Sequence, residues 1–249
     1  MSKSVPCDVV QAGAAMTALD SVSGYRLTVP AGWQRVTTGD GSKESVDRLI
    51  RWQLRRHSGR DHVLAERSLR ELMPRLVADA EGAGALDLYF YSEMIRGIPV
   101  TMSFVVSITY LGAMAAEADE RDLASVAGFG AADAGFVDIG VGRCFRAVEH
   151  RAPSVGEYRS LVSAQLGVSV DLATMEPATP ESRDAIALLR QEEAAGRVLP
   201  STRVSYLVPV PASPGAFLLA TFTCDDSALS RAQMFMFDAI VSTLTWESE

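Results

Sequence analysis

The clearest fold signal in the chain is Phe217-Leu-Leu-Ala-Thr-Phe-Thr-Cys224, which is followed at once by Asp225-Asp226-Ser227. The residues of the first segment are apolar or β-branched and carry no charge, which predicts a strand with both faces buried or nearly so. The polar residues after it can accept hydrogen bonds from the first N–H groups of a helix, and the aspartates suit the positive end of the helix dipole. We therefore expect a strand and then a helix.

The expected helix has apolar residues at helical spacing: Met236, Phe237, Ile240, Val241 and Leu244. They form one continuous stripe, so the helix is predicted to lie with this stripe on a sheet. Its polar residues Arg231, Gln233 and Asp238 are predicted mostly to face away from the sheet.

Strand patterns recur along the rest of the chain. They occur at residues 25–30, in a hairpin over 86–110 with its turn at Arg96-Gly97, at 136–139 and 143–150, and at 202–210. Helices are predicted at 42–58, 61–81 and 118–127, with a kink or break before Pro74 because proline cannot donate to the carbonyl four residues earlier.

These elements predict an α+β fold, a mostly antiparallel sheet of about six strands with helices packed over it. We expect a single domain over residues 1–249. The sheet pattern lapses over 151–201, which is predicted to be a loosely packed insertion or lid.

The composition indicates a folded protein of ordinary solubility. Apolar residues make up 48% of the chain and the net charge is −8, which disfavours a surface that binds nucleic acid throughout. Cys7, Cys144 and Cys224 lie far apart without a CxxC motif, which favours a reduced, cytoplasmic protein without disulfides or a zinc knuckle. No apolar run predicts a signal peptide or a membrane-spanning helix, so membrane insertion is not expected.

Two terminal features carry a family resemblance. Tyr25-Arg-Leu-Thr-Val-Pro-Ala-Gly-Trp33 precedes the expected sheet, and the closing strand and helix end in Leu244-Thr-Trp246. In these features the chain resembles the PsbP-like α/β/α sandwich family of photosystem accessory proteins, a Ran-binding import factor and some bacterial lipoproteins. The resemblance implies a non-catalytic module that binds another macromolecule. The arginine- and alanine-rich composition also resembles that of proteins from GC-rich bacteria.

The helix predicted at 42–58 has a basic outer face, which consists of Arg48, Arg51, Trp52, Arg55 and Arg56. Basic residues outnumber acidic ones over 43–75, although the whole chain is acidic. This face predicts a docking surface for another protein, for which its positive charge suggests an acidic character, and a solvated helix face with mixed salt bridges is the alternative. Self-association is left open.

A second candidate site is the polar face of the 86–110 hairpin. Tyr89, Tyr91 and Glu93 alternate with apolar residues and are predicted to stand near Thr101 and Ser103. A pocket on this face, with 151–201 as its lid, would make the protein an enzyme or a small-ligand binder.

No motif predicts catalysis, a metal or a cofactor. The sequence lacks GxSxG, HExxH, P-loop and dinucleotide-binding patterns. Cys144 and His150 fall on one strand face, but their Cα atoms would be about 20 Å apart, which is too far for one site. The predicted function is therefore a non-catalytic, cytoplasmic protein-binding or accessory module.

Overall fold

The structure is a computed structural model that describes residues 22–55, 59–95, 98–129, 133–154, 156–157, 183, 187, 190–198, 200–225 and 230–248. It has an α+β fold in which helices pack over a mostly antiparallel sheet, as the sequence predicted. Arg56, the helix cap predicted at Asp226 and Ser227, and most of the region predicted to be an insertion or lid lie outside the described residues.

Within the described residues, seven strands form one sheet in the order β2-β3-β4-β8-β7-β6-β5, and every neighbouring pair is antiparallel. The bounds are β2 Trp33–Thr37, β3 Ala85–Ile95, β4 Ile98–Tyr110, β5 Asp133–Ile139, β6 Gly142–Arg151, β7 Ser201–Pro209 and β8 Ala216–Asp225. Strand β8 lies in the middle, between β4 and β7. A central strand with both faces covered needs the uncharged sequence that β8 has.

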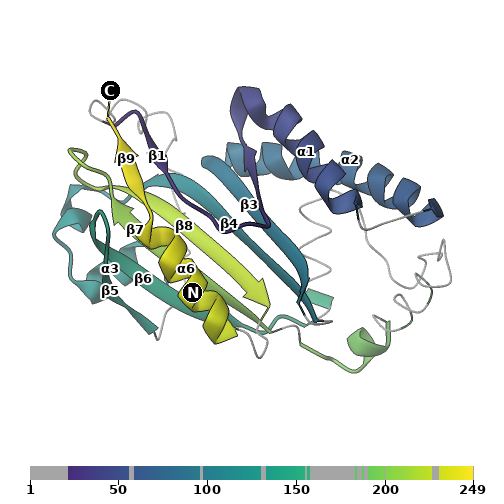
Figure 1. Ribbon diagram of the computed structural model, residues 1–249. Helices are drawn as coiled ribbons and strands as arrows, with labels where there is room; N and C mark the ends of the chain where they lie inside the picture. Colours follow the sequence, from purple (N-terminus) through teal and green to yellow (C-terminus); the bar gives the residue numbers. More distant parts are fainter. Residues whose placement is uncertain are drawn as a thin grey trace, which may run out of the picture.

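Helices cover both faces of this sheet (Figure 1). Helix α6, Ser230–Ser242, crosses one face, which we call the α6 face. Helices α1 (Ser42–Leu54), α2 (Gly59–Gly82) and α3 (Glu120–Val126) pack on the other face, which we call the far face, with α1 and α2 at the β2 edge and α3 at the β5 edge. Two short 3₁₀ turns, η2 at Gly39–Gly41 and η3 at Ala113–Ala116, precede α1 and α3.

The core of the α6 face is a column of aromatic rings that joins β3, β4, β8 and α6. The ring centroids of Tyr89 and Phe104 are 4.1 Å apart, those of Phe104 and Phe222 are 4.4 Å apart, and those of Phe222 and Phe237 are 4.5 Å apart. Phe237 is completely buried, so the apolar stripe predicted for this helix does face the sheet.

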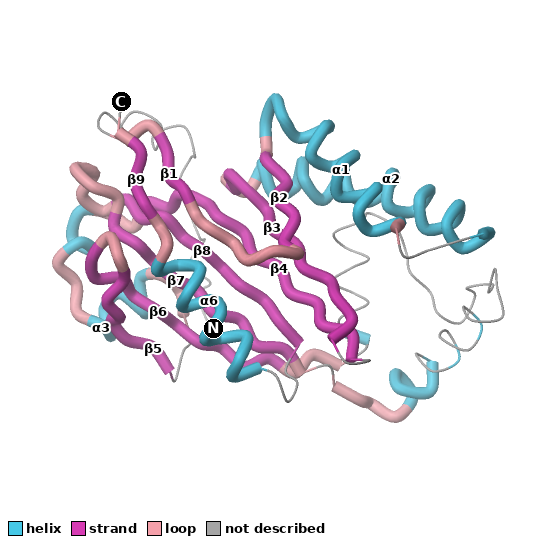
Figure 2. The backbone as a smooth tube through the Cα atoms, in the orientation of Figure 1, coloured by secondary structure: helices cyan, strands magenta, loops and turns pink. Residues whose placement is uncertain are grey.

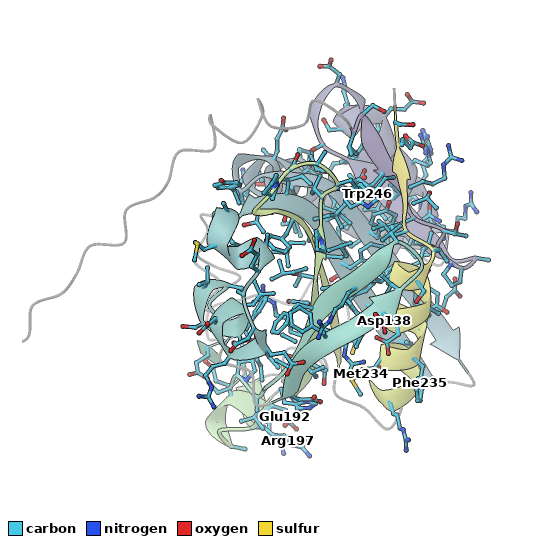
Figure 3. The ribbon with its side chains drawn as sticks, turned by 90° about the vertical axis from the view of Figure 1, so that its left-hand side faces the viewer. Asp138, Glu192, Arg197, Met234, Phe235 and Trp246 are labelled. Atoms are coloured by element: carbon cyan, nitrogen blue, oxygen red, sulfur yellow. The ribbon has the colours of Figure 1, made fainter. Side chains whose placement is uncertain are left out.

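The prediction for the polar residues of α6 was partly wrong. Gln233 is buried, and Asp238 reaches back to the sheet, where it accepts a hydrogen bond from Tyr206. Arg231 does face outward as predicted, and so does the aromatic Phe235, which is 63% exposed (Figure 3), with the Arg231 guanidinium 5.8 Å from its ring. Helical spacing identified the buried stripe but not the polar residues at its margins.

The far face has two separate apolar cores. Val46, Leu49, Ile50 and Leu54 of α1, together with Met73 and Val77 of α2, pack on Val36 and Leu88. Leu123 of α3 packs with Phe145, Leu207 and Phe217 near the other edge. Helix α2 continues through Pro74 rather than breaking before it. No helix in the described part of the chain is long and apolar enough to cross a bilayer.

The segment predicted as a strand at 25–30 does not join the main sheet. Strand β1, Gly24–Arg26, instead pairs with β9, Thr245–Glu247, near the C-terminus. The loop that follows β1 crosses the α6 face on its way to β2 (Figure 2), and Leu27 and Val29 pack on the core there. Gly32, with φ of 96°, then places Trp33 at the start of β2.

Candidate functional site

The predicted basic face of α1 lies at the β2 end of the molecule (Figure 1). Arg48, Arg51 and Arg55 are exposed and form what we call the basic ridge. Arg48 has Glu44 at 3.9 Å, one helical turn away. Within the described part of the chain, Arg51 and Arg55 have no ion-pair partner. The ridge therefore carries positive charge that the surrounding structure does not neutralise.

Trp52 is not fully on the basic ridge. It is half-buried and packs against the α1/α2 core beside Leu49 and Leu54. The sequence pattern predicts Trp52 with the arginines, opposite the buried stripe. Its large ring reaches the core margin from a flanking position on the helix, so Trp52 contributes to packing as well as to the surface.

A hollow of about 540 Å³ opens between α2 and the helix that carries the basic ridge, α1, although no arginine of the ridge lines it. Its floor is apolar, since Val46, Ile50 and Val77 are each at most 5% exposed. The remaining lining residues, most of them polar or at the helix surface, are Ser42, Lys43, Asp47, Arg70, Pro74, Ala78 and Glu81. Arg70 and Asp47 are 3.1 Å apart and join the two helices. The structure thus places an apolar recess on the same helix as unpaired cations.

The second candidate site, the hairpin face with two tyrosines, is divided between the two faces of the sheet. Tyr89 lies opposite Phe104 and Tyr91 lies opposite Met102, so both tyrosines are on the α6 face. Ser103 lies opposite Phe90 and is therefore on the far face, together with Thr101. The predicted set of Tyr89, Tyr91, Glu93, Thr101 and Ser103 does not come together as one surface.

The two-residue turn of the hairpin could have revealed this division. Ile95 lies opposite Ile98 across Arg96-Gly97, and this pairing fixes every other pair up to the bulge near Ala85. Because side chains alternate along each strand, a register that differs by one residue moves a whole set to the opposite face. Arg96 and Gly97 themselves lie outside the described residues, and a face shared by Tyr89 and Ser103 would need a register that differs by one residue from the observed one.

Asp87 is the centre of a buried polar cluster on the α6 face. Its side chain is 3% exposed and accepts two hydrogen bonds from Arg35, from Nε and from Nη2, each at 2.8 Å. Tyr25 donates a third hydrogen bond, from its hydroxyl to Asp87 Oδ2. This cluster ties β1 to β2 and β3. A carboxylate held by a bidentate arginine and a phenol is well satisfied, which indicates a structural role.

A second cluster of the same composition lies beneath α6. Tyr206 is fully buried and donates to Asp238 Oδ1 at 2.6 Å, while Arg146 Nη1 donates to both carboxylate oxygens, at 3.0 and 3.2 Å. The cluster connects α6 to β6 and β7. Neither cluster has a local sequence signal, because the three residues of each come from three different elements.

The buried tyrosines predict a loss of stability at high pH. Burial, and then the nearby Asp87, raises the pKa of Tyr89 from 10.0 to about 12, and burial followed by hydrogen bonding to a carboxylate raises the pKa of Tyr25 and Tyr206 further. The native state holds these protons more tightly than the unfolded state, so stability is complete below pH ~10 and falls as the pH rises above it.

Urea unfolding between pH 8 and 11.5 checks this expectation, with Tyr89→Phe as the comparison variant. The variant should show a shallower decline above pH ~10, because it lacks one of the titrating groups. An identical decline in both proteins would show that Tyr89 does not contribute.

A polar stripe crosses four strands of the far face. Ser103, Thr223, Arg203 and Glu149 lie opposite one another on β4, β8, β7 and β6. Arg203 Nη1 is 3.9 Å from Glu149, and Arg203 Nε is buried with no hydrogen-bond partner in the described structure. Burial, and then Arg151, lowers the pKa of Arg203. Ser103 of the second candidate site belongs to this stripe, and Thr101 lies two residues away on the same strand face.

The described residues contain no group of three or more His, Cys, Asp or Glu side chains placed to hold a metal ion. Cys144 is buried and free, and burial, followed by the charge of Asp238, raises the pKa of its thiol to about 12. A thiol with a raised pKa is a poor nucleophile at neutral pH.

Comparison with protein families, with curated proteins and with solved structures gave no match to this chain. The resemblance to PsbP-like proteins therefore remains a prediction from the sequence.

Proposed function

We propose that the protein is a non-catalytic, cytoplasmic protein-binding module whose basic ridge docks an acidic partner. The observation that carries the proposal is the pair Arg51 and Arg55, exposed on one side of α1 and without an ion-pair partner in the described structure. Unneutralised surface cations attract an acidic partner and orient it during approach.

The surroundings of the ridge support a protein as the partner. The α1/α2 hollow, which opens on the same helix, supplies apolar surface, and Trp52 lies half-buried at the margin of the same core. Protein interfaces combine apolar anchors with a charged rim, and tryptophan and arginine are common among their strongest contacts. An apolar recess on the helix that carries the basic ridge is therefore suited to a protein partner.

The ligand-binding alternative has less support. Tyr89 is 3% exposed and Asp87 is 2% exposed, so the tyrosine side of the hairpin offers a ligand little access to these two groups. The remaining members, Thr101 and Ser103, lie on the other face of the sheet. Cys144 and Cys224 are both buried and are not joined in a disulfide, which supports the proposed reducing, cytoplasmic location.

Charge reversal of the ridge tests the proposal. Partners are captured from the host with the wild-type protein, identified and purified, and their affinities are then measured for Arg51→Glu/Arg55→Glu. Affinity should fall about tenfold or more at low salt, and the difference should shrink as salt screens the charges. The unfolding midpoint should stay the same, because both side chains are exposed and unpaired.

The matched control is Arg121→Glu/Arg143→Glu, at the opposite edge of the sheet. Both arginines are exposed, and the double substitution changes the net charge by the same amount. The control should retain binding. Equal losses in the two variants would indicate an effect of total charge, and unchanged binding by the ridge variant would refute the proposed function.

A further inference from the structure

Strand β5 ends the main sheet on the side away from α1 and the basic ridge. It pairs with β6 along its whole length, from Asp133 to Ile139, and no strand in the described part of the chain pairs with its other side, which we call the open side. In Figure 3 the viewer looks onto this part of the molecule, with Asp138 of β5 labelled. An open strand side can pair with a strand of another chain unless something covers it.

A hydrogen bond identifies the backbone groups on the open side. The N–H of Phe136 donates to Oε1 of Glu120 at 3.1 Å, so it points away from β6. Because backbone groups alternate in direction along a strand, those of Ala134 and Asp138 also point to the open side, while those of the residues between them face β6. The open side therefore presents the backbone groups of three residues, and the central N–H is already bound within the chain.

Helix α3 holds Glu120 in this position. Glu120 is the first residue of α3, and the Asp119 side chain accepts a hydrogen bond from the N–H of Asp122 at 2.9 Å, which fixes the first turn. Leu123 anchors the helix in a core of the far face. A Cβ atom built on Gly135 would lie 3.4 Å from Glu120 Oε1, so the carboxylate lies directly against the strand. Oε1 stands where a carbonyl oxygen of an added strand would accept the same hydrogen bond.

A second copy of β5 fits the open side in an antiparallel register centred on Phe136. The two Phe136 residues then lie opposite each other, and Ala134 lies opposite Asp138 of the second copy. These are the residues whose backbone groups point outward, so each pair can exchange both hydrogen bonds. Asp133 lies opposite Ile139 of the second copy, so no two carboxylates face each other directly. A two-fold arrangement of this kind closes after two copies.

We propose that the contact between Glu120 and Phe136 closes the open side of β5, and that without this contact β5 pairs with β5 of a second copy of the chain. The acidic side chain thus prevents an association that the strand itself permits. The inference goes beyond the proposed function, since it concerns the opposite edge of the sheet and does not depend on the basic ridge.

Glu120→Ala tests the closure and the pairing together. At low protein concentration, residue-resolved hydrogen exchange should show the Phe136 amide exchanging about tenfold faster than in the wild-type protein, because a hydrogen bond to a carboxylate is worth this much or more. At high concentration, sedimentation equilibrium should show the mass of the variant rising toward that of a dimer. The amides of Ala134, Phe136 and Asp138 should then become protected. The wild-type protein should show no such rise in mass.

Two further variants separate the hydrogen bond from the charge. Glu120→Gln keeps an acceptor oxygen, so it should retain both the protected Phe136 amide and the wild-type mass. Glu117→Ala removes the same charge from an exposed position just before α3, and Glu117 has no hydrogen bond to β5 in the described structure. This variant should also behave as the wild-type protein does.

Asp138→Pro, added to Glu120→Ala, tests the pairing of the strands. The Asp138 side chain is exposed and its N–H points to the open side, so proline removes a donor for an added strand without removing a hydrogen bond to β6. Dimer formation should be lost, and the Phe136 amide should exchange fast at every concentration.

Three results would overturn the inference. An unchanged Phe136 amide in Glu120→Ala would mean that Glu120 does not close the open side. A fast amide without an increase in mass at high concentration would exclude pairing with a second copy. A dimer that persists after Asp138→Pro would show that the two copies meet through another surface.

Discussion

Replacement of Phe237 by alanine is expected to lower the free energy of unfolding by about 3–5 kcal/mol. Phe237 is fully buried at the end of the aromatic column, with its ring centroid 4.5 Å from that of Phe222. Its removal leaves a cavity between α6 and the centre of the sheet. The surrounding strands β8 and β7 are hydrogen-bonded on both sides and cannot collapse easily into that space.

Phe235→Ala is the matched control for this prediction. Phe235 is on the same helix and is 63% exposed, so its loss should change the free energy of unfolding by well under 1 kcal/mol. Urea titrations of the three proteins give the comparison. Similar destabilisation by the two substitutions would mean that α6 does not face the sheet as described.

Asp87→Ala is expected to be the second most damaging substitution, with a loss of about 2–4 kcal/mol. It removes the acceptor of two hydrogen bonds from Arg35 and one from Tyr25. Deletion of one member of a buried pair leaves the others without a partner in a desolvated place. The expected loss of free energy is smaller than for a fully buried ion pair, because the Arg35 side chain is 54% exposed and can be solvated by water when Asp87 is absent.

A double-mutant cycle with Arg35→Met checks that the loss comes from the pair. The two substitutions should show a coupling energy of about 1 kcal/mol or more. Asp138→Ala, at an exposed carboxylate on edge strand β5, serves as the control and should have almost no effect. Additive effects of Asp87→Ala and Arg35→Met would exclude a coupled cluster.

The two Tyr–Asp–Arg clusters could not be predicted from the periodicity of single elements, because each cluster joins side chains from three elements. Asp238 was assigned to the outer face of its helix because it lies outside the apolar stripe. In the structure Asp238 accepts hydrogen bonds from Tyr206 and Arg146. These two residues are on strands β7 and β6, which precede the helix in the sequence. A polar side chain at the margin of a helix face can point toward the sheet or toward solvent. Its direction depends on whether a hydrogen-bonding partner is available on the sheet.

The candidate site also has one part that the sequence predicts and one part that it does not. The basic ridge was predictable, because the positions of Arg48, Arg51 and Arg55 follow from the helical period once Val46 and Leu49 are placed inward. The hollow that opens on the same helix was not predictable, since it depends on the distance between α1 and α2 and on the side of α2 that carries Pro74 and Ala78. Helical periodicity describes one helix and says nothing about the gap between two.

The sequence by itself determined the fold class and most of the elements, but not strands β2 and β9. Apolar periodicity gave the strands at 86–110, 136–150, 202–210 and 217–224 and the stripe of α6, because the burial of one face is a local property of each segment. Only the tertiary structure decided that β1 pairs with β9, which face of the sheet holds Tyr89, and that Asp87 and Asp238 are bound by arginine and tyrosine. These features depend on register and on contacts between residues distant in sequence, and their energies come from partners that no local pattern specifies.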